Sequence, residues 1–178
     1  MKITNFSASR SQEVIDLFTK VFSASEGREA GEAIGWLVAD LINTTREADI
    51  LGFVALLEDE IVGCIFFTRL TLSNDKTAFM LSPVAIAIRQ QGKGTGQALI
   101  RFGLESLKSM QVDLVVTYGD PAFYSKAGFQ QISEEVIKAP QTLTQPEGWL
   151  AQSLQNGVIN VTGESCQCVE AFNKQEYW

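Results

Sequence analysis

The feature that most constrains the fold is a run of closely spaced glycines, Gly92-Lys93-Gly94-Thr95-Gly96. Residues 79–88 before it are largely apolar, as in a buried strand, and residues 97–110 after it have the apolar spacing of a helix. Glycines that lead from a strand into a helix leave backbone N–H groups, and the positive end of the helix dipole, facing an anion. The run therefore predicts a phosphate site on a strand–loop–helix unit.

The spacing of these glycines excludes two common phosphate motifs. A P-loop has a glycine five positions before its Gly-Lys pair and a serine or threonine after it, whereas this chain has Ala87 and Gly94 there. A dinucleotide-binding fingerprint has a third glycine at its sixth position, which is Gln97 or Leu99 in the two possible alignments. Neither a nucleotide hydrolase nor a dinucleotide-dependent enzyme fits.

The run does match the acyl-CoA signature [Gln/Arg]-x-x-Gly-x-[Gly/Ala] of the Gcn5-related N-acetyltransferases. It matches in two overlapping registers, one starting at Arg89 and the other at Gln91. We prefer the second, in which Gly94 and Gly96 are the motif glycines, because it places residues 98–100 where the helix of this family packs its first apolar turn. Gly92 and Lys93 then form the variable pair.

A second motif follows in residues 113–129. Residues 113–119 have the apolar and β-branched composition of a buried strand. The segment after it resembles the Tyr-x-x-x-Gly-Phe element of the same family, a short helix that leads into the next strand. Asp120 suits the helix cap, Pro121 the first helical position, and Gly128 the left-handed residue that ends the helix.

Two motifs in this order and at this distance give the chain a clear resemblance to the Gcn5-related N-acetyltransferases, and in particular to their YhbS-like branch. The resemblance implies a mixed α/β (α+β) fold, with a central, mostly antiparallel twisted sheet flanked by helices, in a single domain over residues 1–178. It also implies that the donor is acetyl-CoA or another acyl-CoA. The acceptor would be a primary amine on a small molecule or a protein, attacking the thioester directly.

The resemblance also assigns site residues. The main chain of Val84, Ala85 and Ile86 is expected to pair with the pantetheine amides. Tyr124 is the candidate acid that protonates the leaving CoA thiolate, and Asp120 either caps its helix or meets the cofactor. The pyrophosphate is expected on backbone N–H groups of six consecutive residues, namely Gln91, Gly92, Lys93, Gly94, Thr95 and Gly96.

A general base is not identifiable from the sequence. The chain has no histidine, which excludes Ser-His and Cys-His hydrolases and leaves a carboxylate, a tyrosine, a terminal amine or water. Acidic residues in the expected turns qualify only by charge: Glu58, Asp59, Glu60 and Asp75. An acyl-CoA sensor without turnover therefore stands beside the enzyme as an alternative.

The amino-acid composition limits the kinds of ligand and partner that the protein is expected to bind. The net charge of −7 argues against a broad nucleic-acid-binding surface. The three cysteines, without any histidine, predict structural thiols and no metal site. No apolar run is long enough for a membrane span, and the N-terminus lacks the pattern of a secretory signal, so we expect a cytoplasmic protein. A homodimer is compatible with the family.

Hydrophobic spacing predicts the remaining elements. Helices are expected over residues 11–22, 30–43, 96–110 and, as a short one, 149–154. Strands are expected over residues 50–57, 61–71, 77–88, 113–119, 130–136, 158–161 and 165–172, with a loop at 140–148. Because Ile88 stands where many family members have proline, the glycine loop is expected to leave its strand later or at a different angle.

Overall fold

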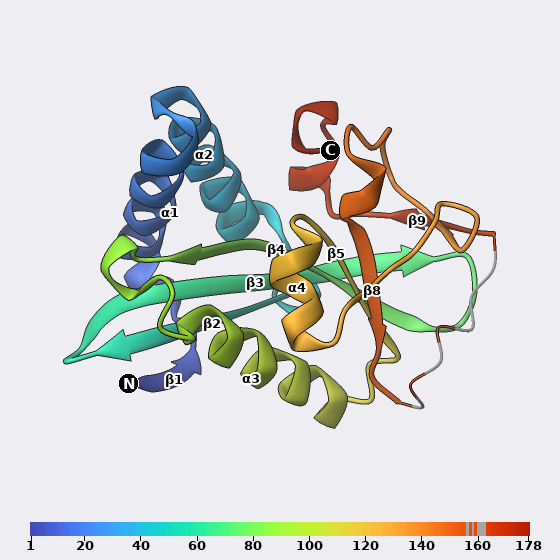
Figure 1. Cartoon of the computed structure of the whole chain (residues 1–178), viewed down its shortest axis with the longest axis horizontal. Helices are drawn as coiled ribbons and strands as arrows, with labels where there is room; N and C mark the ends of the chain where they lie inside the picture. The colour runs from blue at the N-terminus through green and yellow to red at the C-terminus, as the bar shows by residue number, and fades with distance from the viewer. Residues whose placement is uncertain (156, 158, 160–162) are drawn as a thin grey trace. The chain divides into compact units, whose positions relative to one another are not determined.

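The computed structural model describes residues 1–155, 157, 159 and 163–178 (Figure 1). Its α-helices are α1 (Ser11–Glu26), α2 (Arg28–Thr44), α3 (Thr95–Ser109) and α4 (Pro121–Tyr124). Its strands are β1 (Lys2–Asn5), β2 (Ile50–Leu57), β3 (Glu60–Leu72), β4 (Thr77–Ile86), β5 (Leu114–Tyr118), β6 (Gln130–Gln131), β7 (Ile137–Lys138), β8 (Trp149–Ser153) and β9 (Glu164–Gln167). Most strand pairs are antiparallel, so the expected mixed α/β fold is confirmed.

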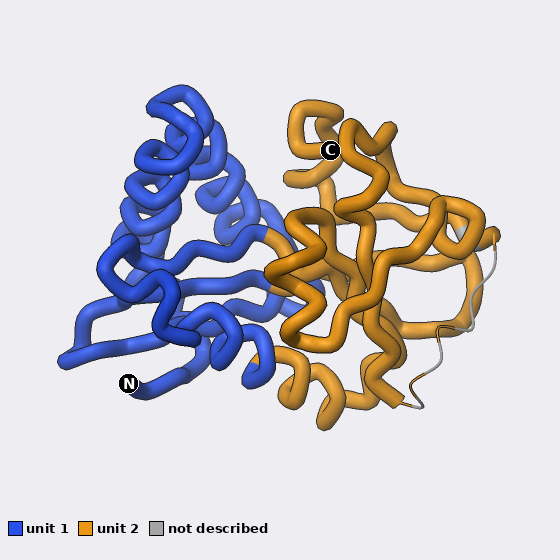
Figure 2. The backbone as a smooth tube through the Cα atoms, viewed as in Figure 1, with its two compact units in different colours: residues 1–66, 83–102 blue, residues 67–82, 103–178 orange. Residues whose placement is uncertain are grey.

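The chain divides into two compact units, shown in different colours in Figure 2. Unit 1 consists of residues 1–66 and 83–102, and unit 2 of residues 67–82 and 103–178. Neither unit is a continuous stretch of sequence, because β3, β4 and α3 each begin in one unit and end in the other.

Unit 1 has the strand order β1-β2-β3-β4 and carries α1 and α2 as a helical hairpin. Two glycines of α2 let its backbone approach α1 closely. A Cβ atom at Gly31 would lie 1.9 Å from Ser23 Oγ, and one at Gly35 would lie 2.2 Å from Thr19 Oγ1. The turn between β2 and β3 has positive φ at Glu58 and Asp59, as a two-residue hairpin turn requires.

Both faces of the unit 1 strands are covered, and the alternation of side chains along each strand decides which residues lie on each face. Val54, Cys64, Phe66 and Ala85 pack against buried side chains of α1 and α2. The opposite face meets the start of α3, where Phe53 contacts Phe102 edge to face. These strands therefore lie inside a three-layer arrangement within unit 1.

Unit 2 has the strand order β3-β4-β5-β8-β6, with β9 paired to both β3 and β7. β4 and β5 run parallel, and β8 pairs antiparallel with β5 over the whole length of β5. Trp149 at the start of β8 is fully buried and donates its indole N–H to the Ile137 carbonyl at 2.9 Å.

The expected long helices and the first strands are confirmed, but four expectations are wrong. The helix expected over residues 149–154 is absent, because residues 149–153 pair with β5 and form β8. The expected strands at 130–136 and 165–172 are short, since β6 has two residues and β9 ends at Gln167. β4 also ends earlier than expected, at Ile86. The strand expected at 158–161 lies outside the described residues except for Ile159. Of the described helices, none combines the length and apolar character needed to cross a membrane.

Candidate active site

The last residues of β4 leave one backbone edge open. The pairing of β4 with β5 ends at Leu81 and Thr117. On its other edge β4 stays against β3, since the Ala87 N–H donates to the Val62 carbonyl at 2.9 Å. Backbone groups alternate in direction along an antiparallel pair, so Ala85 faces β3 like Ala87, whereas Val84 and Ile86 face the opposite edge. Of the three predicted strand residues, Val84 and Ile86 thus present main-chain groups that an extended ligand can pair with.

The chain leaves β4 two residues before the expected end of the strand. Residues Ile88–Gln90 form a 3₁₀ turn in which the Ile88 side chain is 53% exposed. The Gln91 side chain reaches back and donates from Nε2 to the Ile86 carbonyl at 3.0 Å. The strand thus ends before Ile88, so the expectation of a later exit is wrong, and the Gln91 hydrogen bond holds the loop against the end of the strand.

The glycine run forms a loop with two left-handed residues. Gly92 has φ +71° and Gly94 has φ +83°, and a Cβ atom at either position would meet no heavy atom within 4 Å. The Ala98 N–H donates to the Gly94 carbonyl, which begins the hydrogen-bonding of α3. Residues 91–94 form a turn, and within the part of the chain that the structure describes the N–H groups of residues 92–96 make no short, well-aligned hydrogen bond to a protein acceptor.

N–H groups in a glycine-rich turn at the N-terminus of a helix such as α3 are of the kind that binds phosphate. Lys93 is exposed within it and adds a positive charge. The N–H of Gln91, by contrast, donates to the Ile88 carbonyl at 3.3 Å, so the row of available donors begins at Gly92. The predicted residues Gly92 to Gly96 and the open edge of β4 are therefore neighbours on one strand–loop–helix segment.

A glycine that sequence reasoning missed lets α3 approach the sheet. A Cβ atom at Gly63 would lie 2.8 Å from side-chain atoms of both Ile86 and Leu99. The first apolar turn of α3 thus packs on β3 where β3 has no side chain, and Thr95 is buried at its start. A glycine within an otherwise apolar strand is the sequence signal for such a close approach.

The second motif folds in unit 2 as expected. Asp120 Oδ1 accepts a hydrogen bond from the Ala122 N–H at 2.9 Å, which makes Asp120 the N-cap of α4. Pro121 occupies the first helical position, and Gly128 has φ +94° at the end of the following 3₁₀ turn. The Asp120 side chain thus caps α4, which is one of the two roles expected for it.

Tyr124 is buried at the end of α4. Its ring contacts Phe123 and Phe129 edge to face, and a Cβ atom at Gly119 would lie 2.7 Å from it. Burial raises the pKa of the Tyr124 phenol, the interaction with the Thr117 side chain lowers it, and the Asp120 charge raises it further, with a net increase. The phenol therefore stays protonated at neutral pH and is suited to donate a proton.

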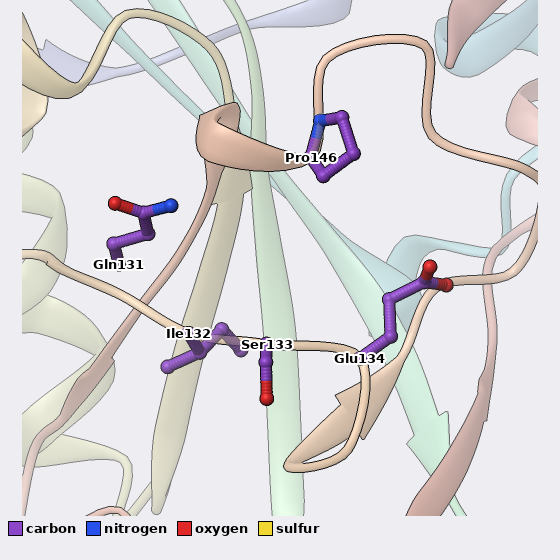
Figure 3. A pocket seen from close by; sticks show the side chains of 5 residues that line it. All are labelled: Gln131, Ile132, Ser133, Glu134 and Pro146. Carbon is purple, nitrogen blue, oxygen red and sulfur yellow. The ribbon is translucent and has the colours of Figure 1, made fainter.

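A cavity of about 410 Å³ lies elsewhere in unit 2 (Figure 3). Its lining consists of Gln131, Ile132, Ser133, Glu134 and Pro146, so none of the predicted site residues lines it.

The described residues contain no cluster of side chains that could hold a metal ion. The three cysteines are free thiols. Burial raises the pKa of the Cys64 thiol well above its usual value and that of Cys166 to about 12, which keeps both protonated and unreactive.

Comparison with known proteins agrees with this geometry. The acetyltransferase (GNAT) domain family matches residues 48–131. The N-acetyltransferase YjhQ of Escherichia coli K12 is 31% identical over 133 residues, which cover 71% of this chain and 74% of YjhQ. YhbS, another N-acetyltransferase of that strain, is 26% identical over 129 residues, covering 72% of this chain and 71% of YhbS.

Solved structures show the same relationship. The E. coli YhbS structure in complex with CoA has a TM-score of 0.82 and 25% identity, covering 97% of this chain and 92% of YhbS. A Brucella melitensis GNAT acetyltransferase in complex with acetyl-CoA shares the fold with a TM-score of 0.65 and 21% identity, over 88% and 90% of the two chains. The chain belongs to the GNAT family of N-acetyltransferases.

Proposed function

We propose that this protein transfers an acetyl or other short acyl group from acyl-CoA to a primary amine. The observation that carries the proposal is the row of N–H donors at residues 92–96, directly after the open backbone edge of β4. A pyrophosphate and an amide-containing arm joined to it are what such a segment can bind. CoA complexes of YhbS and of the Brucella enzyme, which share the fold, support the same donor.

The donor would be held by main-chain groups of two kinds. The N–H groups of residues 92–96 bind the pyrophosphate, with Lys93 as a supporting charge. Val84 and the Ile86 N–H pair with the pantetheine amides, because the Ile86 carbonyl already accepts from Gln91. The side chain of Ala85 belongs to the core instead.

Transfer requires a proton for the leaving sulfur. The amine nitrogen bonds to the thioester carbonyl carbon, the carbon–sulfur bond breaks, and the nitrogen loses one proton to solvent. We assign Tyr124 as the acid that gives its phenolic proton to the sulfur and regains one from solvent. Its raised pKa keeps that proton in place until the thiolate forms.

Free CoA release, measured with acetyl-CoA and a panel of primary amines, tests this proposal. The expected result is amine-dependent release that Tyr124→Phe reduces. Tight acetyl-CoA binding without turnover on any amine would instead identify an acyl-CoA sensor. Absence of acetyl-CoA binding by calorimetry would contradict both.

We further propose that residues 1–178 act as a single acetyltransferase domain, since the main chain passes between the two units at three points. A single cooperative unfolding transition by calorimetry is the expected result, and two separate transitions would contradict it. A homodimer stays a prediction, which light scattering on the purified protein tests.

A further inference from the structure

The cavity of unit 2 lies between two segments that are distant in the sequence. Four of its lining residues, Gln131 to Glu134, come from β6 and the chain after it, and Pro146 comes from the turn before β8. In Figure 3, Gln131 and Glu134 lie on opposite sides of the view with the Pro146 ring between them. The volume of about 410 Å³ falls within the range of about 300–1,000 Å³ that is usual for small-molecule sites.

Hydrogen bonds hold both walls of the cavity in place. On one wall, the Ile132 N–H donates to the Trp149 carbonyl at 3.0 Å. On the other wall, the Gln145 N–H, directly before Pro146, donates to the Tyr118 hydroxyl at 2.7 Å. A site whose walls are already fixed loses little conformational entropy when a ligand binds.

Both walls are also connected to the residues around Tyr124. Two residues after Pro146, the Gly148 carbonyl accepts a hydrogen bond from the Gly119 N–H at 3.0 Å. A Cβ atom at Gly119 would lie 2.7 Å from the Tyr124 ring. On the other wall, β6 directly follows Phe129, whose ring contacts that of Tyr124 edge to face. The cavity and the candidate acid thus share neighbouring residues within unit 2.

Glu134 is the charged side chain among the five lining residues. No ion pair among the described residues involves it. Its Oε1 accepts a hydrogen bond from the Ala139 N–H at 3.3 Å, which leaves the negative charge without a cationic partner. Such a carboxylate attracts an ammonium group and repels an anion. The lining therefore favours a cationic ligand, and Ile132 and Pro146 offer apolar surface for its hydrocarbon part.

An ammonium group paired with a carboxylate has no lone pair and cannot attack a thioester. An acceptor bound through Glu134 therefore needs a second amino group that reacts. We propose that this cavity binds the non-reacting ammonium group of the acceptor, so that the preferred acceptors are small diamines. This inference rests on the proposed function for the transfer step, whereas binding of the cation is a property of the free protein and can be measured without acyl-CoA.

Amide NMR of isotope-labelled protein tests the binding, with diaminobutane as the cation and butanediol as its uncharged analogue. The diamine is expected to shift the amide signals of residues 131–134, and the diol is expected to leave them in place. Glu134→Gln removes the charge but keeps an oxygen that can accept from the Ala139 N–H. It is expected to weaken diamine binding about five- to tenfold. Higher salt is expected to weaken binding to the unsubstituted protein as well.

Glu135 offers a matched control, because it is the neighbouring carboxylate, is exposed and does not line the cavity. Glu135→Gln is expected to leave the affinity for diaminobutane unchanged. Unchanged affinity in Glu134→Gln, or an equal loss in both variants, would overturn the proposal. Binding of the diol as tightly as the diamine would overturn it too.

Steady-state kinetics then test whether the bound cation is the acceptor. Glu134→Gln is expected to raise the KM for diaminobutane about five- to tenfold with little change in kcat. The KM for butylamine, which has one amino group, is expected to stay nearly the same. An equal effect on both amines would contradict the diamine preference. If the diamine binds through Glu134 but no amine is acetylated, the proposed function fails, and the cavity is the site of a cation that is not a substrate.

Discussion

Gly92 and Gly94 allow a sharp test of the proposal that the glycine loop binds the CoA pyrophosphate. Both have positive φ, and a Cβ atom at either position would have no heavy atom within 4 Å. Alanine at either site therefore has the same conformational cost, about 1–2 kcal/mol for the left-handed region, without any steric term. For a domain of this size we expect both variants to lower Tm by roughly 2–8 °C.

The affinity for CoA is expected to differ between the Gly92→Ala and Gly94→Ala variants. In the register that begins at Gln91, Gly94 lies where the pyrophosphate approaches, and Gly92 belongs to the variable pair. A methyl group at Gly94 is expected to displace a charge-assisted hydrogen bond and raise the CoA Kd by at least about tenfold. Gly92→Ala is expected to change the Kd by less than about threefold, as for an ordinary surface substitution.

Isothermal titration calorimetry with CoA, together with thermal melting of each variant, measures both quantities. Equal losses of affinity would refute our choice of register and favour the alternative that begins at Arg89, in which both glycines are motif positions. Unchanged affinity in both variants would show that the loop does not bind the pyrophosphate.

Three further predictions follow from the site. Tyr124→Phe is expected to lower kcat about 100-fold with little change in KM. Unfolded tyrosines ionise near pH 10 whereas buried Tyr124 resists ionisation, so the folded protein loses stability above that pH. Tyr124→Phe should therefore lessen the loss of unfolding free energy above about pH 10, as measured by denaturant titration. Asp120→Ala is expected to reduce stability by about 1 kcal/mol through loss of the helix cap, and Asp120→Asn to retain most of it in the same thermal melts. Gln91→Leu, which removes the donor to the Ile86 carbonyl, is expected to weaken CoA binding severalfold, and unchanged calorimetric affinity would show that this contact does not hold the loop.

The parts of the fold that sequence could predict are those fixed by local chemistry. The capping of α4 by Asp120, its start at Pro121 and its left-handed end at Gly128 depend on single residues with strong backbone preferences, and all three are confirmed. The turn at Glu58 and Asp59 follows equally from the apolar runs on either side.

The errors occur where a distant partner decides the structure. Residues 149–153 contain leucine, alanine and glutamine, which suit a helix, but pairing with β5 makes them a strand. The end of β4 depends on where β3 and the Gln91 side chain hold the backbone, which periodicity does not record.

The discontinuous units also limit how this protein can be divided. The shortest continuous fragment that contains all of unit 1 is residues 1–102, and it necessarily carries residues 67–82, which belong to unit 2. In that fragment the β4 residues 78–81 lack the β5 neighbour against which they pair in the whole chain. Such an apolar, unpaired strand edge is a template for association with other chains. Fragments ending near this point, whether made by proteolysis or present during synthesis, are therefore expected to aggregate, and shortened versions of the protein should keep β5 and β8.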